Sequence, residues 1–320
     1  MRFVDADAIR DAAPMSELLD AVEAAYRDVV AGRDRSPVRS RVPLPGGDLL
    51  LMPAVREGGS GSSVKLVTVT PDNPMRGLPT IHAVVIWIDA ASGEPLAVLD
   101  GPTVTAMRTG AASGVATRLM ARPDATVLSL FGTGAQAAWQ VRAVLAARSI
   151  RELRVYSRHA ASRAEFASAM AEELGGEVRV VAADSAEAAV RGADVICCAT
   201  TSSEPVFDAE WVDPGTHING IGAYRLDMVE LPPKLFARAA MVAVDARAAA
   251  LEEAGDLVAA QRGGQLEPKG FVELGSLPAD WAQQRDPAAI TIFKSVGLAI
   301  QDLVTAELVM SRLDSGEAVS

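Results

Sequence analysis

Val127-Leu128-Ser129-Leu130-Phe131 runs directly into Gly132-Thr133-Gly134-Ala135-Gln136-Ala137, and this stretch decides the fold class. It is typical of a buried strand, a glycine turn and the start of a helix, with the pattern GxGxxA. Gly132 permits a tight turn, Gly134 lets the backbone approach a pyrophosphate closely, and Ala137 is small enough for the helix to pack on the strand. Free N–H groups and the dipole at the start of the helix favour an anion there. The stretch therefore predicts a dinucleotide-binding turn.

The residues after 125 alternate between strand and helix patterns. The strand patterns are continuous apolar runs, as expected when helices cover both faces of a sheet. This order predicts a parallel sheet with crossover helices, which is a Rossmann-type domain. The expected strands are 126–131, 153–156, 178–181, 194–199, 216–221 and 241–244, and the expected helices are 136–147, 160–174 and 185–191.

The end of the second strand bears on the choice between NAD and NADP. An acidic residue at this place would bind the ribose 2′-hydroxyl of NAD. The chain instead has Ser157 and Arg158 there, and no Asp or Glu before Glu165. A serine and an arginine suit a 2′-phosphate, because a guanidinium binds phosphate bidentately. We therefore expect NADP(H) to be favoured, with NAD(H) as the alternative.

The residues before 121 follow a different pattern. An amphipathic helix is expected over 15–30, and short strands separated by Gly- and Pro-rich turns then indicate an antiparallel sheet. A helix of small residues is expected over 105–120, and a long amphipathic helix over 292–313 that packs back against this part. The expected strands are 39–44, 49–53, 63–70, 81–89 and 95–100. The fold class is thus α/β, with a Rossmann-type parallel sheet domain at 119–295 and an α+β N-terminal domain formed by 1–118 with 296–320.

The composition is that of an ordinary globular protein, with 49% hydrophobic and 22% charged residues among 320. Lys and Arg total 30 and Asp and Glu total 41, so the net charge of −11 argues against nucleic acid or an anionic membrane as a partner. The two cysteines, Cys197 and Cys198, are adjacent and offer no disulfide framework, and no cluster of His, Cys and carboxylates suggests a metal site. No signal peptide or membrane-spanning stretch is found, so a reducing cytoplasm is the expected location.

Ten different short motifs are spread along most of the chain, from residue 37 to residue 306. They are Pro37-Val38-Arg39, Met52-Pro53-Ala54, Lys65-Leu66-Val67-Thr68, Leu99-Asp100-Gly101, Thr105-Ala106-Met107-Arg108-Thr109, Gly132-Thr133-Gly134-Ala135-Gln136, Glu204-Pro205-Val206, Pro214-Gly215-Thr216-His217-Ile218-Asn219, Glu253-Ala254-Gly255-Asp256 and Phe293-Lys294-Ser295-Val296-Gly297. Together they resemble the ornithine cyclodeaminase/μ-crystallin family, and the combination is very specific to it. The resemblance implies a homodimer whose N-terminal domain serves substrate binding and dimerisation. It also implies chemistry on a small amino, imino or keto acid, at the carbon that bears the carboxylate.

Three cations match active-site residues of that family: Arg39, Lys65 and Arg108. Arginine binds a substrate carboxylate bidentately and can hold the α-carbon in place for hydride transfer. Lysine is the one of the three that can shift its pKa readily and exchange a proton. We therefore expect Lys65 to bind the substrate and to donate a proton or polarise it, while Arg39 and Arg108 clamp the carboxylate.

The resemblance also implies a set of cofactor contacts. Thr80 follows Lys65 at a spacing similar to the family's, and Arg108 is expected to touch the cofactor as well as the substrate. The expected cofactor-binding residues are Thr80, Arg108, Gly132, Thr133, Gly134, Ala135, Gln136, Ser157, Arg158, Thr200, Thr201, Ile221 and Ser295.

The chain departs from true ornithine cyclodeaminases at two places. Those enzymes carry an acidic residue just before the Met-Pro pair, where this chain has Leu50 and Leu51, and an aspartate where it has Tyr224. Both changes move the expectation away from ornithine cyclisation. Asp227 matches an acidic residue of the ketimine reductase and alanine dehydrogenase branches. It is expected either to transfer a proton as a second catalytic residue or to cap a helix that begins near Glu230.

The leading hypothesis is therefore NAD(P)H-dependent reduction of a small, cyclic α-imino acid to the amino acid. An alanine dehydrogenase-type activity is the alternative, followed by ornithine cyclodeamination to proline and ammonia. A non-catalytic protein that binds NADPH and a small carboxylate is the hypothesis from a different class.

Overall fold

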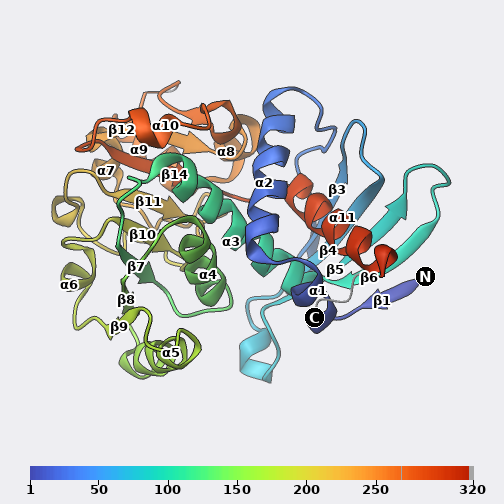
Figure 1. Ribbon diagram of the computed structural model, residues 1–320, viewed down its shortest axis with the longest axis horizontal. Coiled ribbons are helices and arrows are strands. Elements are labelled where there is room, and N and C mark those ends of the chain that lie inside the picture. The colour runs from blue at the N-terminus through green and yellow to red at the C-terminus, as the bar shows by residue number, and fades with distance from the viewer. Residues whose placement is uncertain (268, 317–320) are drawn as a thin grey trace. The chain divides into compact units, whose positions relative to one another are not determined.

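The computed structural model describes residues 1–267 and 269–316, and the chain forms two compact units (Figure 1). The first unit consists of Met1–Arg108 together with Leu298–Ser320, and the second of Thr109–Gly297. The division falls inside the helix α3 (Gly101–Met120), whereas the boundaries expected from the sequence were after residues 118 and 295. The first turns of this helix belong to the first unit and its last turns belong to the second.

The first unit is built on a six-stranded sheet with the order β1-β6-β5-β4-β3-β2. The β1 strand pairs with β6 in parallel, and the other pairs are antiparallel. The strands are β1 (Arg2–Val4), β2 (Ser40–Leu44), β3 (Gly47–Val55), β4 (Gly61–Val69), β5 (Ile81–Asp89) and β6 (Pro95–Asp100). The helices are α1 (Ala6–Ala12), α2 (Met15–Val30), the 3₁₀ turn η1 (Asn73–Arg76) and α11 (Ala299–Ser315).

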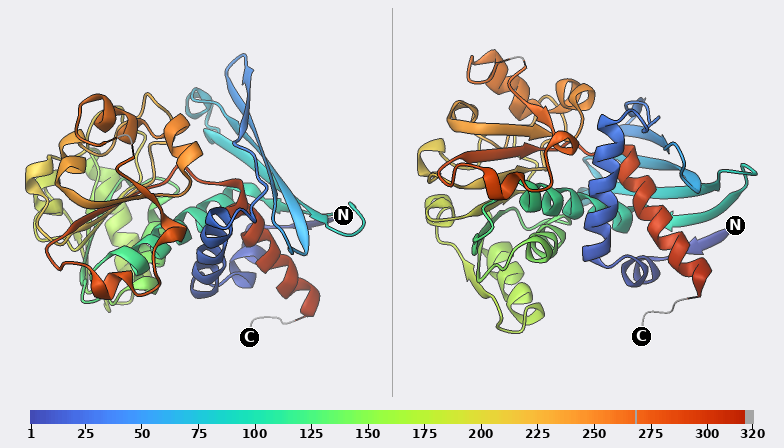
Figure 2. Two further views of the ribbon diagram at one scale, coloured as in Figure 1. Left: turned by 90° about the horizontal axis from the view of Figure 1, so that it is seen from above. Right: turned by 45° about the horizontal axis from the view of Figure 1, so that its top comes forward.

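One face of this sheet is covered by helices (Figure 2). The α11 helix packs against α2 and against β3, β4 and β5, while α1 packs against β6. Alternate residues of β4 are buried beneath these helices, among them Ser63, Lys65 and Val67. Because strand side chains alternate between faces, Lys65 faces the helices although its neighbours Val64 and Leu66 do not. The period of the strand thus places a charged side chain in the core of the first unit.

The second unit holds an eight-stranded sheet in which every pair is parallel, in the order β13-β12-β14-β11-β10-β7-β8-β9. The strands are β7 (Val127–Phe131), β8 (Glu152–Tyr156), β9 (Arg179–Ala182), β10 (Val195–Cys198), β11 (His217–Gly220), β12 (Ala239–Val244), β13 (Val272–Glu273) and β14 (Ile290–Lys294). The helices and 3₁₀ turns are α4 (Ala137–Ala147), α5 (Ala160–Glu173), α6 (Ala186–Val190), η2 (Ala209–Trp211), α7 (Pro233–Arg238), α8 (Arg247–Glu253), α9 (Gly255–Arg262), η3 (Leu274–Ser276) and α10 (Trp281–Gln284).

The central strands of this sheet are buried along their whole length, as β10, β11 and β14 show. The residues of α4, α5, β7 and β8 form one continuous apolar core. The α/β architecture and the Rossmann-type sheet expected from the sequence are thereby confirmed. The strand order reverses at β7, which has β8 on one side and β10 on the other, and ligands of such sheets bind at this switch point.

The helix expected over 292–313 is wrong in its first part. Ile290–Lys294 is the strand β14, which lies between β11 and β12, and the helix α11 begins only at Ala299. Between them the backbone of Gly297 has φ +81°, a conformation that favours glycine and ends the strand. The apolar run of Ile290–Phe293 is rich in β-branched residues, which suit a buried strand better than a helix. The β1 strand and the α1 helix lie outside the expected elements, and β1 gives the first sheet one parallel edge.

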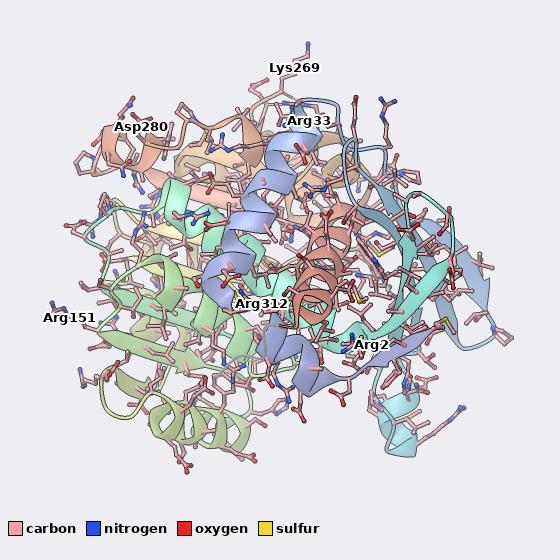
Figure 3. The ribbon with its side chains drawn as sticks, turned by 45° about the vertical axis from the view of Figure 1, so that its right-hand side comes forward. Arg2, Arg33, Arg151, Lys269, Asp280 and Arg312 are labelled. Carbon is pink, nitrogen blue, oxygen red and sulfur yellow. The ribbon has the colours of Figure 1, made fainter. Side chains whose placement is uncertain are left out.

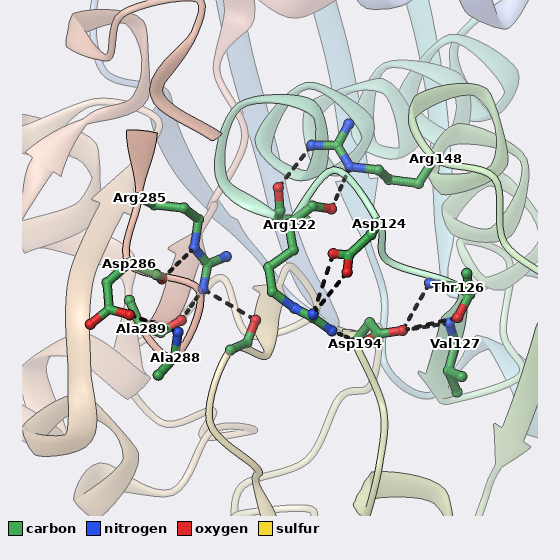
Figure 4. Close-up of polar contacts among 12 residues, drawn as sticks. Arg122, Asp124, Thr126, Val127, Arg148, Asp194, Arg285, Asp286, Ala288 and Ala289 are labelled. Carbon is green, nitrogen blue, oxygen red and sulfur yellow. Dashed lines mark hydrogen bonds and ion pairs between the residues drawn. The ribbon is translucent and has the colours of Figure 1, made fainter. Parts of the chain in front are cut away.

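The last turn of α3 is held by arginine side chains at the amino ends of the strands (Figure 4). Arg148 donates to the carbonyls of Arg122 (2.9 Å) and Ala121 (2.8 Å), just after the helix. Arg285 donates to the carbonyl of Met120, the last helical residue (2.6 Å). These carbonyls have no partner within the helix, and cations are favourable at a helix C-terminus. Asp194 in turn pairs with Arg122. The carboxyl-terminal half of α3 is thereby fixed to the second unit.

Other charged side chains extend from the surface of both units, as Figure 3 shows for Arg2, Arg33, Arg151 and Lys269. Among the described residues, none of the helices has both the length and the apolar character needed to cross a membrane.

Candidate active site

Lys65 is the most deeply buried of the three expected cations. Its side chain is 2% exposed. Its neighbours across the sheet are Met52 on β3 and Val85 on β5, both buried and apolar. An ammonium in such surroundings has lost its hydration, so it needs a partner of opposite charge.

That partner is Asp302 on α11, a residue that the sequence analysis did not identify. Lys65 Nζ lies 2.7 Å from Asp302 Oδ2 and 2.9 Å from Oδ1, and the carboxylate is fully buried. The Lys65 ammonium also donates to Thr105 Oγ1 on α3 at 3.4 Å. The helix α11 therefore supplies a counterion to a lysine on β4.

Arg108 joins the same carboxylate from α3. Its Nε donates to Asp302 Oδ1 at 3.1 Å and its Nη1 donates to Gln301 Oε1 at 2.9 Å. The Gln301 amide is itself fixed, because its Nε2 donates to the hydroxyl of Tyr26 on α2 at 2.6 Å. These bonds orient the guanidinium within the first unit. We call Lys65, Arg108 and Asp302 the cationic cluster.

The cationic cluster holds two cations and one carboxylate, so it carries an excess positive charge. The pKa of Lys65 is lowered from 10.5 to about 7, chiefly by burial and also by the charges of Arg108 and Arg39, while Asp302 acts to raise it. Arg39, in the segment before β2, therefore acts on the same ammonium. A lysine with a pKa near neutrality can give up and recover a proton, and the excess positive charge suits a carboxylate ligand.

In the second unit, the glycine turn after β7 has the geometry expected for a dinucleotide. Gly132 has φ +99°, and a Cβ at this position would lie 2.5 Å from the carbonyl oxygen of Ala199. Its N–H donates to the carbonyl of Tyr156 at 2.9 Å, which ties the turn to β8. At Gly134, by contrast, a Cβ would meet no atom within 4 Å, so the space beside this exposed backbone is open. The side-chain oxygen of Gln136 is buried without a hydrogen-bond partner among the described residues. The turn thus fits a ligand that approaches the backbone closely.

The expected cofactor residues of the second unit all follow the carboxyl ends of parallel strands, at one edge of the sheet. Ser157 and Arg158 follow β8, and the exposed Arg158 side chain lies at the start of α5. The remaining ones are Thr133 and Ala135 after β7, Thr200 and Thr201 after β10, Ile221 after β11 and Ser295 after β14. Thr80, just before β5, and Arg108, on α3, both lie in the first unit, and their contact with a cofactor stays a prediction.

A buried carboxylate holds the loops that carry three of these positions. Glu230 accepts from the backbone N–H groups of Thr200 (2.5 Å), Gly222 (2.7 Å) and Ala223 (2.8 Å). Burial raises the pKa of Glu230, while the charge of Lys294 and the hydrogen bonds from Thr200 and Ala223 act to lower it. The loops after β10 and β11 are thereby joined at the edge where a cofactor is expected.

Asp256 and Lys294 complete this second group, which we call the anionic cluster (Glu230, Asp256 and Lys294). Asp256 Oδ1 accepts from the backbone N–H groups of Glu230 (2.5 Å) and Leu231 (2.9 Å). Lys294 Nζ lies 2.7 Å from Asp256 Oδ2, and both side chains are fully buried. All three residues were unassigned in the sequence analysis, although two of them stand in the motifs quoted there.

A further carboxylate fixes the loop of Ser295. Asp245, after β12, accepts from the Ser295 hydroxyl (2.9 Å) and from the N–H groups of Val296 (2.9 Å) and Gly297 (2.7 Å). The position of Ser295 is therefore set by a neighbouring loop.

Asp227 lies in an exposed loop, where both of its oxygens accept from Arg225, at 2.9 Å from Nε and 2.6 Å from Nη2. The helix that it was expected to cap does not begin near Glu230, because α7 begins at Pro233 after the N-cap Pro232. The capping alternative is therefore wrong. The catalytic role of Asp227 stays a prediction.

The comparisons with known proteins cover nearly the whole chain. The model of the ornithine cyclodeaminase/mu-crystallin family matches residues 2–317. The chain belongs to this family. A Δ(1)-pyrroline-2-carboxylate reductase of Bacillus cereus is 38% identical over 311 residues, which is 96% of this chain and 95% of the relative.

Two solved structures of the family are similar over their whole length. The Δ(1)-pyrroline-2-carboxylate reductase of Thermococcus litoralis, in complex with NADH and L-proline, has a TM-score of 0.91 at 33% identity and covers 99% of this chain and 98% of its own. An archaeal alanine dehydrogenase dimer with bound NAD has a TM-score of 0.88 at 32% identity, with the same coverage. These members of the ornithine cyclodeaminase/mu-crystallin family both bind a nicotinamide cofactor, as expected here from the glycine turn.

Proposed function

We propose that this protein is an NAD(P)H-dependent reductase of a small cyclic α-imino acid, such as a pyrroline-2-carboxylate. The observation that carries the proposal is the cationic cluster, which buries Lys65 with an excess of positive charge. The same chain carries the dinucleotide turn at Gly132. The named activity of the Bacillus cereus and Thermococcus litoralis relatives supports it.

The residues divide the chemistry between them. Arg39 and Arg108 bind the substrate carboxylate, which fixes the imine carbon for attack. A bound reduced nicotinamide supplies the hydride to that carbon. Lys65 gives its proton to the imine nitrogen as the electron pair of the C=N bond moves there. The products are the cyclic amino acid, the oxidised cofactor and a neutral Lys65, which regains a proton from water.

The edge after β8 favours NADP(H) as the cofactor. Ser157 and Arg158 stand there in place of an acidic residue, and Arg163 lies over the ring of Tyr156 and donates to the Ser157 carbonyl at 3.2 Å. Two cations at this edge suit a 2′-phosphate. We expect Arg158→Ala to raise the KM for NADPH about tenfold and to leave that for NADH nearly unchanged, because a phosphate contact is worth about 1.4 kcal/mol or more. Equal changes for both cofactors would contradict the preference.

We also propose that the protein forms a homodimer through the sheet face opposite its helices. That face carries apolar rows that cross the strands, such as Leu51, Leu66 and Val84, and these side chains are only half-buried. Covering these apolar side chains with another surface would stabilise the protein. The dimer of the archaeal alanine dehydrogenase supports a second copy of the chain as that surface. The mass in solution tests this, because Leu66→Glu is expected to convert a dimer to monomers. A monomeric wild-type protein would exclude the dimer.

The function is tested by a panel of imino and keto acids with NADH and NADPH. Oxidation of the cofactor with Δ1-pyrroline-2-carboxylate or Δ1-piperideine-2-carboxylate is expected. Ammonia-dependent reduction of pyruvate alone would favour an alanine dehydrogenase, and release of ammonia from ornithine without net cofactor turnover would favour a cyclodeaminase. Binding of NADPH and a carboxylate without any turnover would favour the non-catalytic alternative. A cytoplasmic location stays a prediction.

A further inference from the structure

We propose that Asp302 is a positioning residue that keeps the Lys65 amino group protonated and directed in the substrate site. This inference rests on the proposed function, because it assigns Asp302 a task in the proton transfer by Lys65. It starts from geometry: both carboxylate oxygens lie within 3 Å of Nζ, at 2.7 and 2.9 Å.

The surroundings of Lys65 all act to remove its proton, with the exception of Asp302. Burial opposes the charged form, and so do the cations of Arg108 on α3 and Arg39 before β2. Asp302 is the carboxylate that acts in the opposite direction, through its charge and its hydrogen bond. Without it, an ammonium between two arginines in an apolar core would be neutral at ordinary pH.

Two further acidic side chains of the packed helices, Glu307 and Asp28, are engaged elsewhere. Glu307 on α11 accepts from Arg56 (2.5 Å) and from Ser60, and Asp28 on α2 accepts from Arg33 (2.8 Å) and Arg56 (3.4 Å). They pair with cations outside the cationic cluster. The charge state of Lys65 therefore depends on one carboxylate.

Asp302 also fixes the direction of the proton donor. Its Oδ1 accepts from both Lys65 and Arg108, so one carboxylate sets the spacing between the proton donor and the guanidinium of the carboxylate clamp. The residue before it, Gln301, holds Arg108 and accepts from the N–H of Leu298 at 2.9 Å, which anchors the start of α11. Two consecutive residues of α11, Gln301 and Asp302, thus position both functional cations.

The test is the pH profile of kcat/KM for the reduction of Δ1-pyrroline-2-carboxylate by the full-length protein with saturating NADPH. The wild-type profile is expected to fall as pH rises through the pKa of Lys65. In Asp302→Asn the falling limb should move to lower pH by at least one pH unit, which is about a tenfold loss of kcat/KM at pH 8 that is partly recovered at low pH. Asp302→Glu should restore a limb close to that of the wild type. The titration of the substrate is common to all variants, so a displacement belongs to the protein.

Asp28→Asn is the matched control, because it also removes a buried carboxylate that pairs with cations in the first unit. It should leave the midpoint of the falling limb unchanged. If Asp302→Asn lowers kcat/KM equally at every pH, Asp302 is only structural and the inference is wrong.

A second measurement needs no turnover. Calorimetric binding of pyrrole-2-carboxylate, a planar analogue that cannot be reduced, is carried out on the wild type and on Asp302→Asn between pH 6 and 9 in two buffers of different ionisation enthalpy. Proton uptake on binding is expected to grow with pH in both proteins, because the carboxylate ligand restores the charge of Lys65, and in Asp302→Asn it should begin at least one pH unit lower. The same pH dependence of proton uptake in both proteins would overturn the inference. Absence of both binding and turnover would instead reject the proposed function.

Discussion

The two units each bury a group of three ionic side chains, and the groups differ in sign and in how their charges are satisfied. The cationic cluster has two cations and one carboxylate, and its donors converge on Asp302. The anionic cluster has two carboxylates and one cation, and its carboxylates also accept from backbone N–H groups of several loops. Buried charge that is balanced by backbone groups stabilises local structure, whereas buried charge left in excess provides a place for a charged ligand. The comparison therefore separates an ionic group that binds from one that holds loops together.

The largest expected effect is the loss of activity when the lysine of the cationic cluster is replaced. Lys65→Met is expected to lower kcat/KM by at least about 10³-fold, because it removes both a proton donor and part of the carboxylate site. Its fold should persist, since Asp302 keeps its bond to Arg108. Steady-state kinetics on the preferred imino acid measures the loss. A variant with more than about a tenth of wild-type activity would show that the proton comes from elsewhere.

The matched substitution in the anionic cluster should act on stability. Lys294→Met leaves the buried carboxylate of Asp256 without its cation, which is expected to cost about 3 kcal/mol or more of the free energy of unfolding. Denaturant unfolding of the two methionine variants under the same conditions checks this. If Lys65→Met proves to be the less stable of the two, the assignment of the cationic cluster to ligand binding and of the anionic cluster to stability is wrong.

How far the sequence could predict these clusters depends on sequence separation. The glycine turn and the strands around it follow from local patterns, and the structure places Gly132 and the strands β7 and β8 where they were expected. Lys65 and Arg108 were found through motifs. Asp302 was missed because its partners are far away in the chain, 237 residues from Lys65 and 194 from Arg108, and no spacing rule reaches that far.

A weaker signal for these partners was present in the sequence. Asp302 follows Gln301 between the apolar residues Ile300 and Leu303 of α11, so a carboxylate beside apolar residues of a helix could have prompted a search for a cation. The error at 292–313 has a related cause. A short apolar run such as Ile290–Phe293 is compatible with a buried helix or a buried strand, and only its place between β11 and β12 decides.

The pH dependence of stability sharpens the comparison further. Lys65 has a pKa of about 7 in the folded protein against 10.5 when unfolded, so between these values the unfolded chain binds the extra proton. The stability of the wild type relative to Lys65→Met should therefore rise with pH above 7, by at most about 1.4 kcal/mol per pH unit. Activity should fall over the same range. Unfolding of both proteins at pH 7, 8 and 9 measures the difference, and a constant difference would mean that Lys65 keeps its proton throughout.

The smallest effect concerns the ligand itself. A carboxylate that neutralises the excess charge of the cationic cluster should stabilise the folded protein, so pyrrole-2-carboxylate at ten times its Kd should add about 1.4 kcal/mol and raise Tm by about 2–4 °C. This rise in Tm should vanish in Lys65→Met and persist in Lys294→Met, because only the first substitution changes the cationic cluster. The uncharged amide of the same ring is the control and should produce no shift in any of the three proteins. A rise in Tm that survives in Lys65→Met but disappears in Lys294→Met would assign ligand binding to the anionic cluster instead. The carboxylate would then bind where backbone N–H groups already satisfy the negative charges of Glu230 and Asp256.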